Sequence, residues 1–207
     1  MSDTDNEEQR PQEKVARKDD WRHKLGNNVT RPVASVLAKL HITPNMLTWS
    51  GLVFPFGALY LLFTEHLIWA GVVTLVGALF DSLDGAVARY TNNITVFGGV
   101  LDSVLDRITE GLMFAGIAVY CFMHEDIIAA AVILFALVMS FTVSYVRARA
   151  EGVGIECNVG ICTRAERIVL MVLSLFTGYF LIAFGIIALL SLITVGQRIY
   201  KVAKAAK

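Results

Sequence analysis

The sequence is short of charged residues and of cysteine, and each shortage narrows the possible classes of protein. Only 17% of the 207 residues are charged, while 56% are hydrophobic, which is too apolar for an ordinary soluble domain of this length. Lysine plus arginine equals aspartate plus glutamate at 18 each, so the net charge favours neither a nucleic acid nor an acidic partner. These values indicate an integral membrane protein, and we expect no nucleic-acid partner.

Cysteine occurs only three times, as Cys121, Cys157 and Cys162. Four residues separate Cys157 from Cys162 and no histidine is close by, which is not the ligand spacing of a zinc site. An odd number of cysteines is compatible with a reducing compartment. We therefore interpret all three as ordinary residues.

The N-terminal part of the chain divides into two regions. Residues 1–20 are rich in charged and amide side chains, so we expect a disordered cytoplasmic tail with no cleaved signal peptide. Residues 21–42 mix basic side chains with Trp21 and several aliphatic residues, a pattern typical of an amphipathic helix that lies at the membrane interface. The expected membrane domain is residues 43–207.

Apolar runs within this domain predict six membrane helices. A bilayer core of about 30 Å needs roughly 20 apolar residues in a helix. Four runs approach or reach that length, namely residues 48–63, 66–80, 98–123 and 127–146. The last run, residues 168–195, has 28 uncharged residues, and we expect it to break into two spans near Gly178 or Gly185. The predicted fold is thus an all-α integral membrane protein with six transmembrane helices and an N-terminal interfacial helix.

The basic residues predict the orientation of these spans. All 18 lysines and arginines lie before the first span, near residues 81–107, between the fourth and fifth spans, or after the sixth. The turns on the opposite side, at residues 64–66 and 124–126, contain none. Because basic loops remain in the cytoplasm, we expect a multi-pass protein of the cell membrane whose two termini and active site are cytoplasmic.

Four aspartates interrupt the apolar pattern, namely Asp81, Asp84, Asp102 and Asp106. The spacings within the two pairs, three and four residues, bring side chains to one face of a helix. If the second and third spans form an antiparallel hairpin, both pairs can meet at the cytoplasmic boundary, where their charges would repel unless cations lay between them. Oxygen ligands without histidine or thiolate suit Mg²⁺ or Mn²⁺, and four carboxylates are enough for a two-metal site that binds phosphate.

Two other interpretations of the aspartates are open. The carboxylates could solvate helix ends at the interface without binding a metal, or they could mark the ion path of a cation-coupled transporter. An ion path needs ionisable groups through the depth of the membrane, whereas the outer halves of the predicted spans carry none. This distribution favours an enzyme that takes a soluble reactant from the cytoplasm and a lipid from the bilayer.

Residues 81–106 resemble the motif of the CDP-alcohol phosphotransferases. All eight fixed positions of that motif are present, in the order Asp81-x2-Asp84-Gly85-x2-Ala88-Arg89-x8-Gly98-x3-Asp102-x3-Asp106. The resemblance implies that the hydroxyl of a small polar alcohol attacks a CDP-linked lipid, either CDP-diacylglycerol or CDP-archaeol, and that a phosphodiester lipid and CMP are formed. It also implies a homodimer in the lipid bilayer.

The resemblance further implies roles for particular residues. Two divalent cations, Mg²⁺ or Mn²⁺, would be held by Asp81, Asp84, Asp102 and Asp106. Asp106 would also act as the general base on the acceptor hydroxyl. The CDP pocket would be formed by Asn45, Thr48, Asp84, Gly85, Ala88 and Arg89.

A second cytoplasmic segment, from Ser144 to the fifth span, contains four arginines. These could simply anchor helices to lipid headgroups, but such a cluster also suits an acceptor that carries phosphate. Here the chain resembles the prokaryotic phosphatidylinositol-phosphate and archaetidylinositol-phosphate synthases. That resemblance implies that inositol phosphate is bound by Ser144, Arg147, Arg167 and Arg198. Arg164 is an alternative to Arg167, and glycerol 3-phosphate is the alternative acceptor.

Overall fold

The computed structural model describes residues 44–90 and 95–205, and every regular element in these ranges is an α-helix. The helices are α2 (Pro44–Ser50), α3 (Val53–Phe63), α4 (Leu67–Tyr90), α5 (Val96–Met123), α6 (Ile127–Glu151), α7 (Arg164–Thr177) and α8 (Phe180–Ala205). The all-α prediction is confirmed for this part of the chain. The predicted tail 1–20 and interfacial helix 21–42 lie outside the described residues.

The break predicted in the last apolar run falls at Gly178. This residue has φ +75°, and its N–H donates a hydrogen bond of 2.8 Å to Ser174 O, which is a helix C-cap that glycine adopts without strain. The other predicted break, Gly185, lies inside α8. At its opposite end, α7 begins with a capping box in which Glu166 accepts a hydrogen bond of 2.7 Å from Thr163 N–H, and this box fixes where the helix starts.

The first two predicted spans differ from expectation in two respects. The first run is not one continuous helix, because the chain turns at Gly51 and Leu52 between α2 and α3. The second difference is that α4 and α5 do not pack as a close hairpin along their described residues. Instead, α4 contacts α2, α3 and α7, while α5 contacts α2, α3 and α6. Helices α2 and α3 are therefore neighbours of both helices that carry the aspartates.

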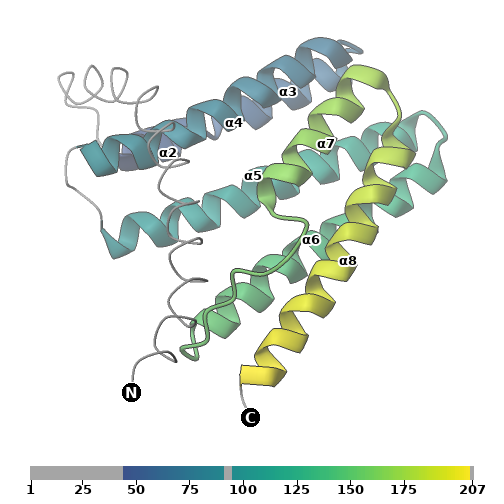
Figure 1. Cartoon of the computed structure of the whole chain (residues 1–207). Coiled ribbons are helices and arrows are strands. Elements are labelled where there is room, and N and C mark those ends of the chain that lie inside the picture. Colours follow the sequence, from purple (N-terminus) through teal and green to yellow (C-terminus); the bar gives the residue numbers. More distant parts are fainter. Residues whose placement is uncertain (1–43, 91–94, 206–207) are drawn as a thin grey trace, which may run out of the picture.

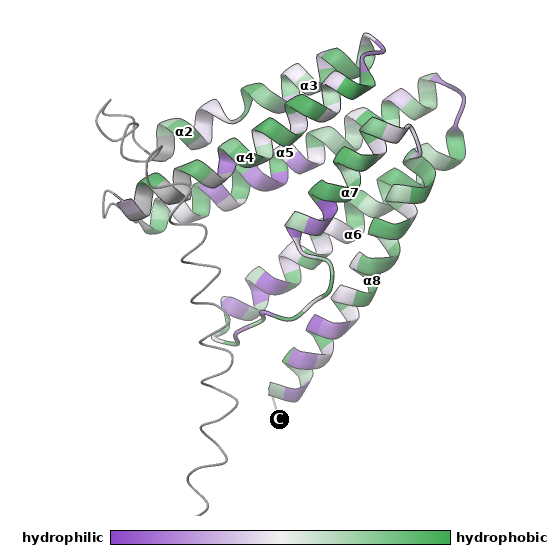
Figure 2. Ribbon diagram, turned by 45° about the horizontal axis from the view of Figure 1, so that its top comes forward, coloured by the Kyte–Doolittle hydropathy of each residue, from purple (hydrophilic) through white to green (hydrophobic). Residues whose placement is uncertain are grey.

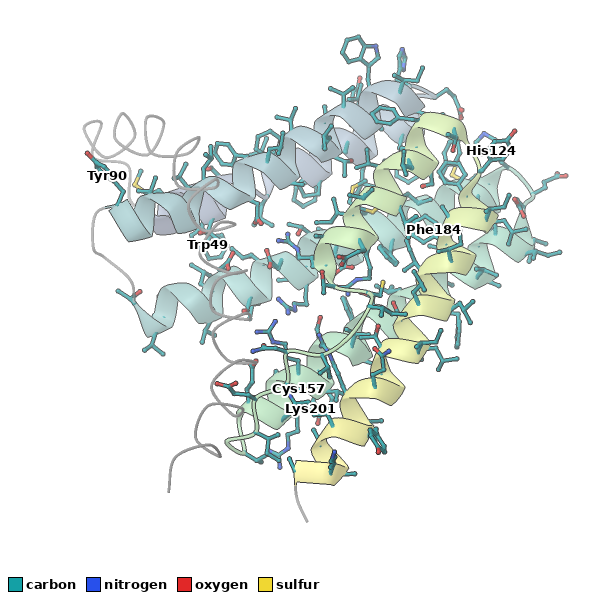
Figure 3. All side chains as sticks on the ribbon, viewed as in Figure 1. Trp49, Tyr90, His124, Cys157, Phe184 and Lys201 are labelled. Carbon is teal, nitrogen blue, oxygen red and sulfur yellow. The ribbon has the colours of Figure 1, made fainter. Side chains whose placement is uncertain are left out.

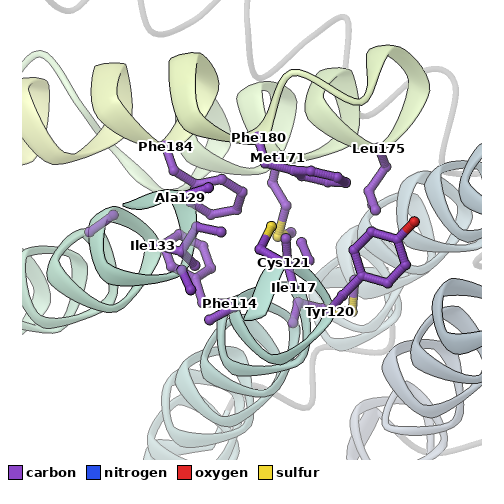
Figure 4. Packing of buried hydrophobic residues seen from close by; sticks show 14 of the residues in the cluster. Phe114, Ile117, Tyr120, Cys121, Ala129, Ile133, Met171, Leu175, Phe180 and Phe184 are labelled. Atoms are coloured by element: carbon purple, nitrogen blue, oxygen red, sulfur yellow. The ribbon is translucent and has the colours of Figure 1, made fainter. Parts of the chain in front are cut away.

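The helices form two groups joined by α5 and α7 (Figure 1). α2, α3 and α4 lie on one side, and α6 packs along α8 on the other, while α7 contacts both α4 and α8. Buried side chains from α5, α6, α7 and α8 form the centre of the core (Figure 4). In this core the rings of Phe114 and Phe184 meet edge to face, with centroids 4.9 Å apart and an interplanar angle of 89°, which is a favourable aromatic geometry.

The outer surface of the helices is apolar. Within residues 44–90 and 95–205, three stretches are long and apolar enough to cross a membrane, namely Met46–Phe63, Ile127–Glu151 and Phe180–Ala205, and Leu67–Asp81 is a shorter apolar stretch. Large side chains such as Val53 and Ile128 are 70% and 69% exposed. Hydrophilic residues gather at the C-terminal ends of α6 and α8, with mainly hydrophobic surface along the rest of both helices (Figure 2). An apolar surface of this extent is typical of a membrane protein.

A polar cluster joins the two turns at the end of the molecule remote from Tyr90 (Figure 3). The Tyr120 hydroxyl donates a hydrogen bond of 2.8 Å to Glu65 Oε2, and His124 Nε2 lies 3.1 Å from Glu65 Oε1. Glu65 has φ +65°, a conformation that is uncommon outside glycine and that needs support from its surroundings. The cluster therefore ties the α3–α4 turn to the end of α5.

Gly160 offers a test of the packing between α8 and the segment that joins α6 to α7. It has φ +133°, and a Cβ atom added there would collide with the Thr194 methyl group of α8. We expect Gly160→Ala to lower the free energy of unfolding by roughly 2–4 kcal/mol, because backbone strain and overpacking each cost about 1–3 kcal/mol. Thermal unfolding of the purified protein in detergent measures this loss.

Gly154→Ala is the matched control. Gly154 also has a positive φ, +82°, but an added Cβ would meet open space. The Gly154→Ala variant should lose only about 1–2 kcal/mol of unfolding free energy, which is the cost of the left-handed backbone alone. Equal losses in the two variants would contradict the close approach of Gly160 to α8.

Candidate active site

Three of the four predicted metal ligands converge in the structure. Asp81 comes from α4, and Asp102 and Asp106 come from adjacent turns of α5. One carboxylate oxygen of each residue lies within 4.8 Å of the others, and all three residues are partly buried. The side chain of Asp84 lies outside the described part of the chain. The spacing of four along α5 places two of the carboxylates on one face, and α4 supplies the third from across the site.

A guanidinium group lies among these carboxylates. Arg164, the first residue of α7, donates a hydrogen bond of 2.6 Å from Nη1 to Asp81 Oδ2, and its Nη2 lies 2.9 Å from Asp106 Oδ1. Arg107 Nη1 is farther away, 3.7 Å from Asp106 Oδ2, and donates instead to Ser103 O at 2.8 Å. The positive charge that the clustered aspartates require is therefore provided within the described chain by Arg164.

Arg164 leaves this cluster incompletely neutralised. One guanidinium group bridges two of the three carboxylates. Although Asp106 Oδ1 is ion-paired, neither it nor Arg164 Nε has a hydrogen-bond partner among the described residues. Carboxylates this close repel each other unless further positive charge is present, and a cluster of carboxylate oxygens is the donor set that Mg²⁺ and Mn²⁺ prefer. The residues therefore fit a divalent cation.

A cavity of about 70 Å³ adjoins the carboxylates. Its lining includes polar groups, among them Asp81, Thr48 and Arg164, and apolar side chains from α3, α5 and α7. This mixture suits a ligand with both an anionic and an apolar part. Of the predicted CDP contacts, Thr48 lines the cavity. The others lie outside the part whose side chains the structure describes, namely Asn45, Asp84, Gly85, Ala88 and Arg89.

A buried ion pair holds α7 against α5. Arg167 donates from Nε to Glu110 Oε1 at 2.6 Å and from Nη2 to Glu110 Oε2 at 3.0 Å. The Ser140 hydroxyl of α6 donates to the same Glu110 at 2.8 Å. Arg167 and Glu110 are only 2% and 5% exposed, so this pair needs its close geometry to offset the cost of desolvation. Glu110 was not predicted as a site residue, although it follows Asp106 by four residues and so lies on the same face of the helix.

The predicted acceptor residues lie around the ends of α6 and α8. Ser144 is partly buried, and Arg147 is exposed and pairs with Glu151 at 2.7 Å. Arg198 is buried and donates to Val143 O at 2.5 Å and to Val159 O at 2.9 Å. Arg147 and Arg167 lie close enough to Arg198 for their like charges to repel it. Positive charge is therefore concentrated here, although Arg167 is already engaged by Glu110.

The segment between α6 and α7 is fixed along α8. Cys162 N–H donates a hydrogen bond of 3.0 Å to the Thr194 hydroxyl, and Arg198 holds Val159 from the same helix. Cys157 and Cys162 are buried and free. Burial raises the pKa of the Cys162 thiol, which keeps it protonated and unreactive. This attachment helps to fix the start of α7 and therefore the position of Arg164, which is the first residue of that helix.

Comparisons with known proteins agree with this arrangement. The sequence model of the CDP-alcohol phosphatidyltransferase family matches residues 41–196. The chain belongs to this family. It is 38% identical over 173 residues to the archaetidylinositol phosphate synthase of Pyrococcus horikoshii, which covers 83% of this chain and 89% of that protein. It is 36% identical over 185 residues to the phosphatidylinositol phosphate synthase of Mycobacteroides abscessus, with 84% and 83% covered.

Solved structures give the same result. The phosphatidylinositol phosphate synthase of Mycobacterium tuberculosis with CDP-DAG bound is similar with a TM-score of 0.78 and 32% identity, over 84% of this chain and 94% of that one. The same enzyme in complex with manganese and citrate matches with a TM-score of 0.77 and 33% identity, over 84% and 88%. These comparisons confirm the family that the aspartate motif indicated and identify the protein as a phosphatidyltransferase of the membrane.

The buried pair of Glu110 and Arg167 yields a stability prediction. We expect Glu110→Ala to lower the free energy of unfolding by about 3–5 kcal/mol, because it leaves the charge of Arg167 buried without a partner. The double variant Glu110→Leu with Arg167→Met should lose less than Glu110→Ala, because it removes both charges. Thermal unfolding in detergent compares the variants. A double variant that is less stable than the single one would contradict the assignment.

Proposed function

We propose that this phosphatidyltransferase joins the phosphatidyl or archaetidyl group of a CDP-linked lipid to inositol phosphate and releases CMP. The observation that carries the proposal is the convergence of Asp81, Asp102 and Asp106 beside a cavity with both polar and apolar lining. The names of the relatives support inositol phosphate as the acceptor, since they are phosphatidylinositol and archaetidylinositol phosphate synthases. These names also favour an enzyme over the alternative of a transporter.

The aspartates would provide the metal site and the base. Asp81, Asp84, Asp102 and Asp106 would hold two divalent cations, Mg²⁺ or Mn²⁺, which supply charge stabilisation for the diphosphate and for the departing CMP. Asp106 would accept the proton of the acceptor hydroxyl. The hydroxyl oxygen then forms a bond to the phosphorus that carries the lipid, the diphosphate bond breaks, and its electron pair leaves with CMP.

Other residues would position the two substrates. Asn45, Thr48, Gly85, Ala88 and Arg89 would line the CDP site together with Asp84, and the position of Thr48 in the cavity wall supports this. The phosphate of the acceptor would be bound by Ser144, Arg147 and Arg198. Arg167, held by Glu110, would add positive charge behind that site rather than a direct contact.

We also propose a topology for the protein. Residues 43–207 form a domain of six membrane-crossing segments, α2 with α3 and then α4 to α8, in a multi-pass protein of the cell membrane. The concentration of lysine and arginine near the aspartates and at the end of α8 supports a cytoplasmic position for the active site and both termini. Family resemblance supports a homodimer.

The acceptor can be tested with the purified protein, CDP-diacylglycerol and Mn²⁺ or Mg²⁺. We expect CMP release with inositol phosphate and at least tenfold less with free inositol or glycerol 3-phosphate, because a phosphate site left unfilled or misplaced loses charge-assisted hydrogen bonds of about 1.5–3 kcal/mol each. Preference for glycerol 3-phosphate would assign the alternative acceptor. The control Asp106→Asn should lose roughly 10²–10⁴-fold in rate, the usual contribution of a general base, while it still binds the CDP-lipid.

Arg147 provides a test of the acceptor site. We expect Arg147→Ala to raise the KM for inositol phosphate by roughly 10- to 100-fold, which corresponds to the loss of one hydrogen bond to a charged group. The KM for the CDP-lipid should change little. The matched control is Arg149→Ala, which removes an exposed arginine two residues along α6, on a different face. Equal changes in the two KM values of Arg147→Ala would contradict the assignment.

A further inference from the structure

We propose that Arg164 is a displaceable countercharge of the metal site. Its guanidinium group bridges Asp81 and Asp106 and competes with a divalent cation for the same oxygens. The affinity of the site for its cation is therefore set by competition with this side chain. This inference rests on the proposed function, because it assumes that the carboxylates hold a divalent cation.

The distances place the guanidinium group and a bound cation in competition for the same oxygens. Arg164 Nη1 is 2.6 Å from Asp81 Oδ2, and Nη2 is 2.9 Å from Asp106 Oδ1. Mg²⁺ binds its oxygen ligands at about 2.0–2.1 Å. A cation bound to those two oxygens would bring a second positive charge close to the guanidinium nitrogens. The two positive groups would also repel each other strongly in this partly buried site.

Arg164 is held in a way that permits departure. Its Nε has no hydrogen-bond partner among the described residues, and neither has Asp106 Oδ1, so the contact with Asp106 is an ion pair without a well-formed hydrogen bond. Arg167 is the contrasting case on the same helix, because it makes two hydrogen bonds to Glu110 and is 2% exposed. The structure therefore buries the Arg167 side chain almost fully and leaves that of Arg164 28% exposed.

The backbone of α7 does not have to move when Arg164 does. The helix start is fixed by the hydrogen bond between Thr163 and Glu166, by the Glu110–Arg167 pair one turn later, and by the attachment of Cys162 to α8. Rotation of the Arg164 side chain alone can release the carboxylates. This division of roles explains why two arginines three residues apart face two separate acidic partners.

The adjoining cavity gives the released side chain a place to go. Arg164 contributes to its lining together with Asp81 and Thr48. A guanidinium group that has left its carboxylates needs another anionic partner, and a phosphate group bound in the cavity would provide one. The binding of the cation and the binding of an anionic ligand in the cavity should therefore strengthen each other.

Titration of the purified protein with Mn²⁺, followed by electron paramagnetic resonance without lipid or acceptor, tests the inference. We expect Arg164→Gln to bind Mn²⁺ about tenfold more tightly than the parent, because the competing charge is gone. Arg164→Lys, which keeps the charge, should remain close to the parent. The matched control Arg149→Gln removes an exposed arginine of α6 and should leave the affinity unchanged.

Thermal unfolding provides a second readout. In excess chelator Arg164→Gln should unfold at a lower temperature than the parent, because the carboxylates lose their countercharge. Saturation with Mn²⁺ should remove that difference, since the cation replaces the side chain. Arg164→Ala serves in the same measurements if the glutamine variant does not fold.

The outcomes separate this inference from the proposed function. Equal or weaker Mn²⁺ binding by Arg164→Gln overturns the countercharge role, while CMP release by the parent still supports the function. If neither the parent protein nor the Arg164→Gln variant binds Mn²⁺, both the metal site and the countercharge role are overturned.

Discussion

The structure depends on the need to compensate negative charge inside an apolar helical bundle. Asp81, Asp102, Asp106 and Glu110 all lie on helices that are otherwise largely hydrophobic. Burial of carboxylates is costly unless positive charge and hydrogen bonds are close. α7 supplies positive charge at two places: Arg164 pairs with the aspartates, and Arg167 pairs with Glu110. The position of this short helix follows from charge compensation as much as from apolar packing.

The two ion pairs differ in a way that matches separate tasks. The pair between Glu110 and Arg167 is closed, has two hydrogen bonds and excludes solvent. The contacts of Arg164 are more open, with side chains that remain about 28% exposed for Arg164 and 29% for Asp81. A closed pair stabilises the arrangement of helices, whereas an open one can exchange partners. On neighbouring turns of α7, Arg167 thus serves stability and Arg164 serves the exchange of ligands that we propose.

Much of this architecture could be predicted from the sequence. The spacing of Asp102 and Asp106 predicted a shared helix face, and the length of the last apolar run predicted the break found at Gly178. The sequence could not assign Arg164 and Arg167 to their partners, because residues three apart lie on nearly the same face and only the packing of α7 separates them. The turn at Gly51 was also missed, and so was the lack of close backbone packing between the described parts of α4 and α5, since both depend on contacts between helices.

The length of α7 bears on where in the bilayer the reaction takes place. With 14 residues, it is about 21 Å long, which is shorter than a hydrocarbon core of about 30 Å. In the orientation that we propose, a helix that reaches the outer boundary at Gly178 begins several ångströms beneath the inner boundary. The aspartates that Arg164 contacts would then lie within the bilayer rather than in the surrounding water.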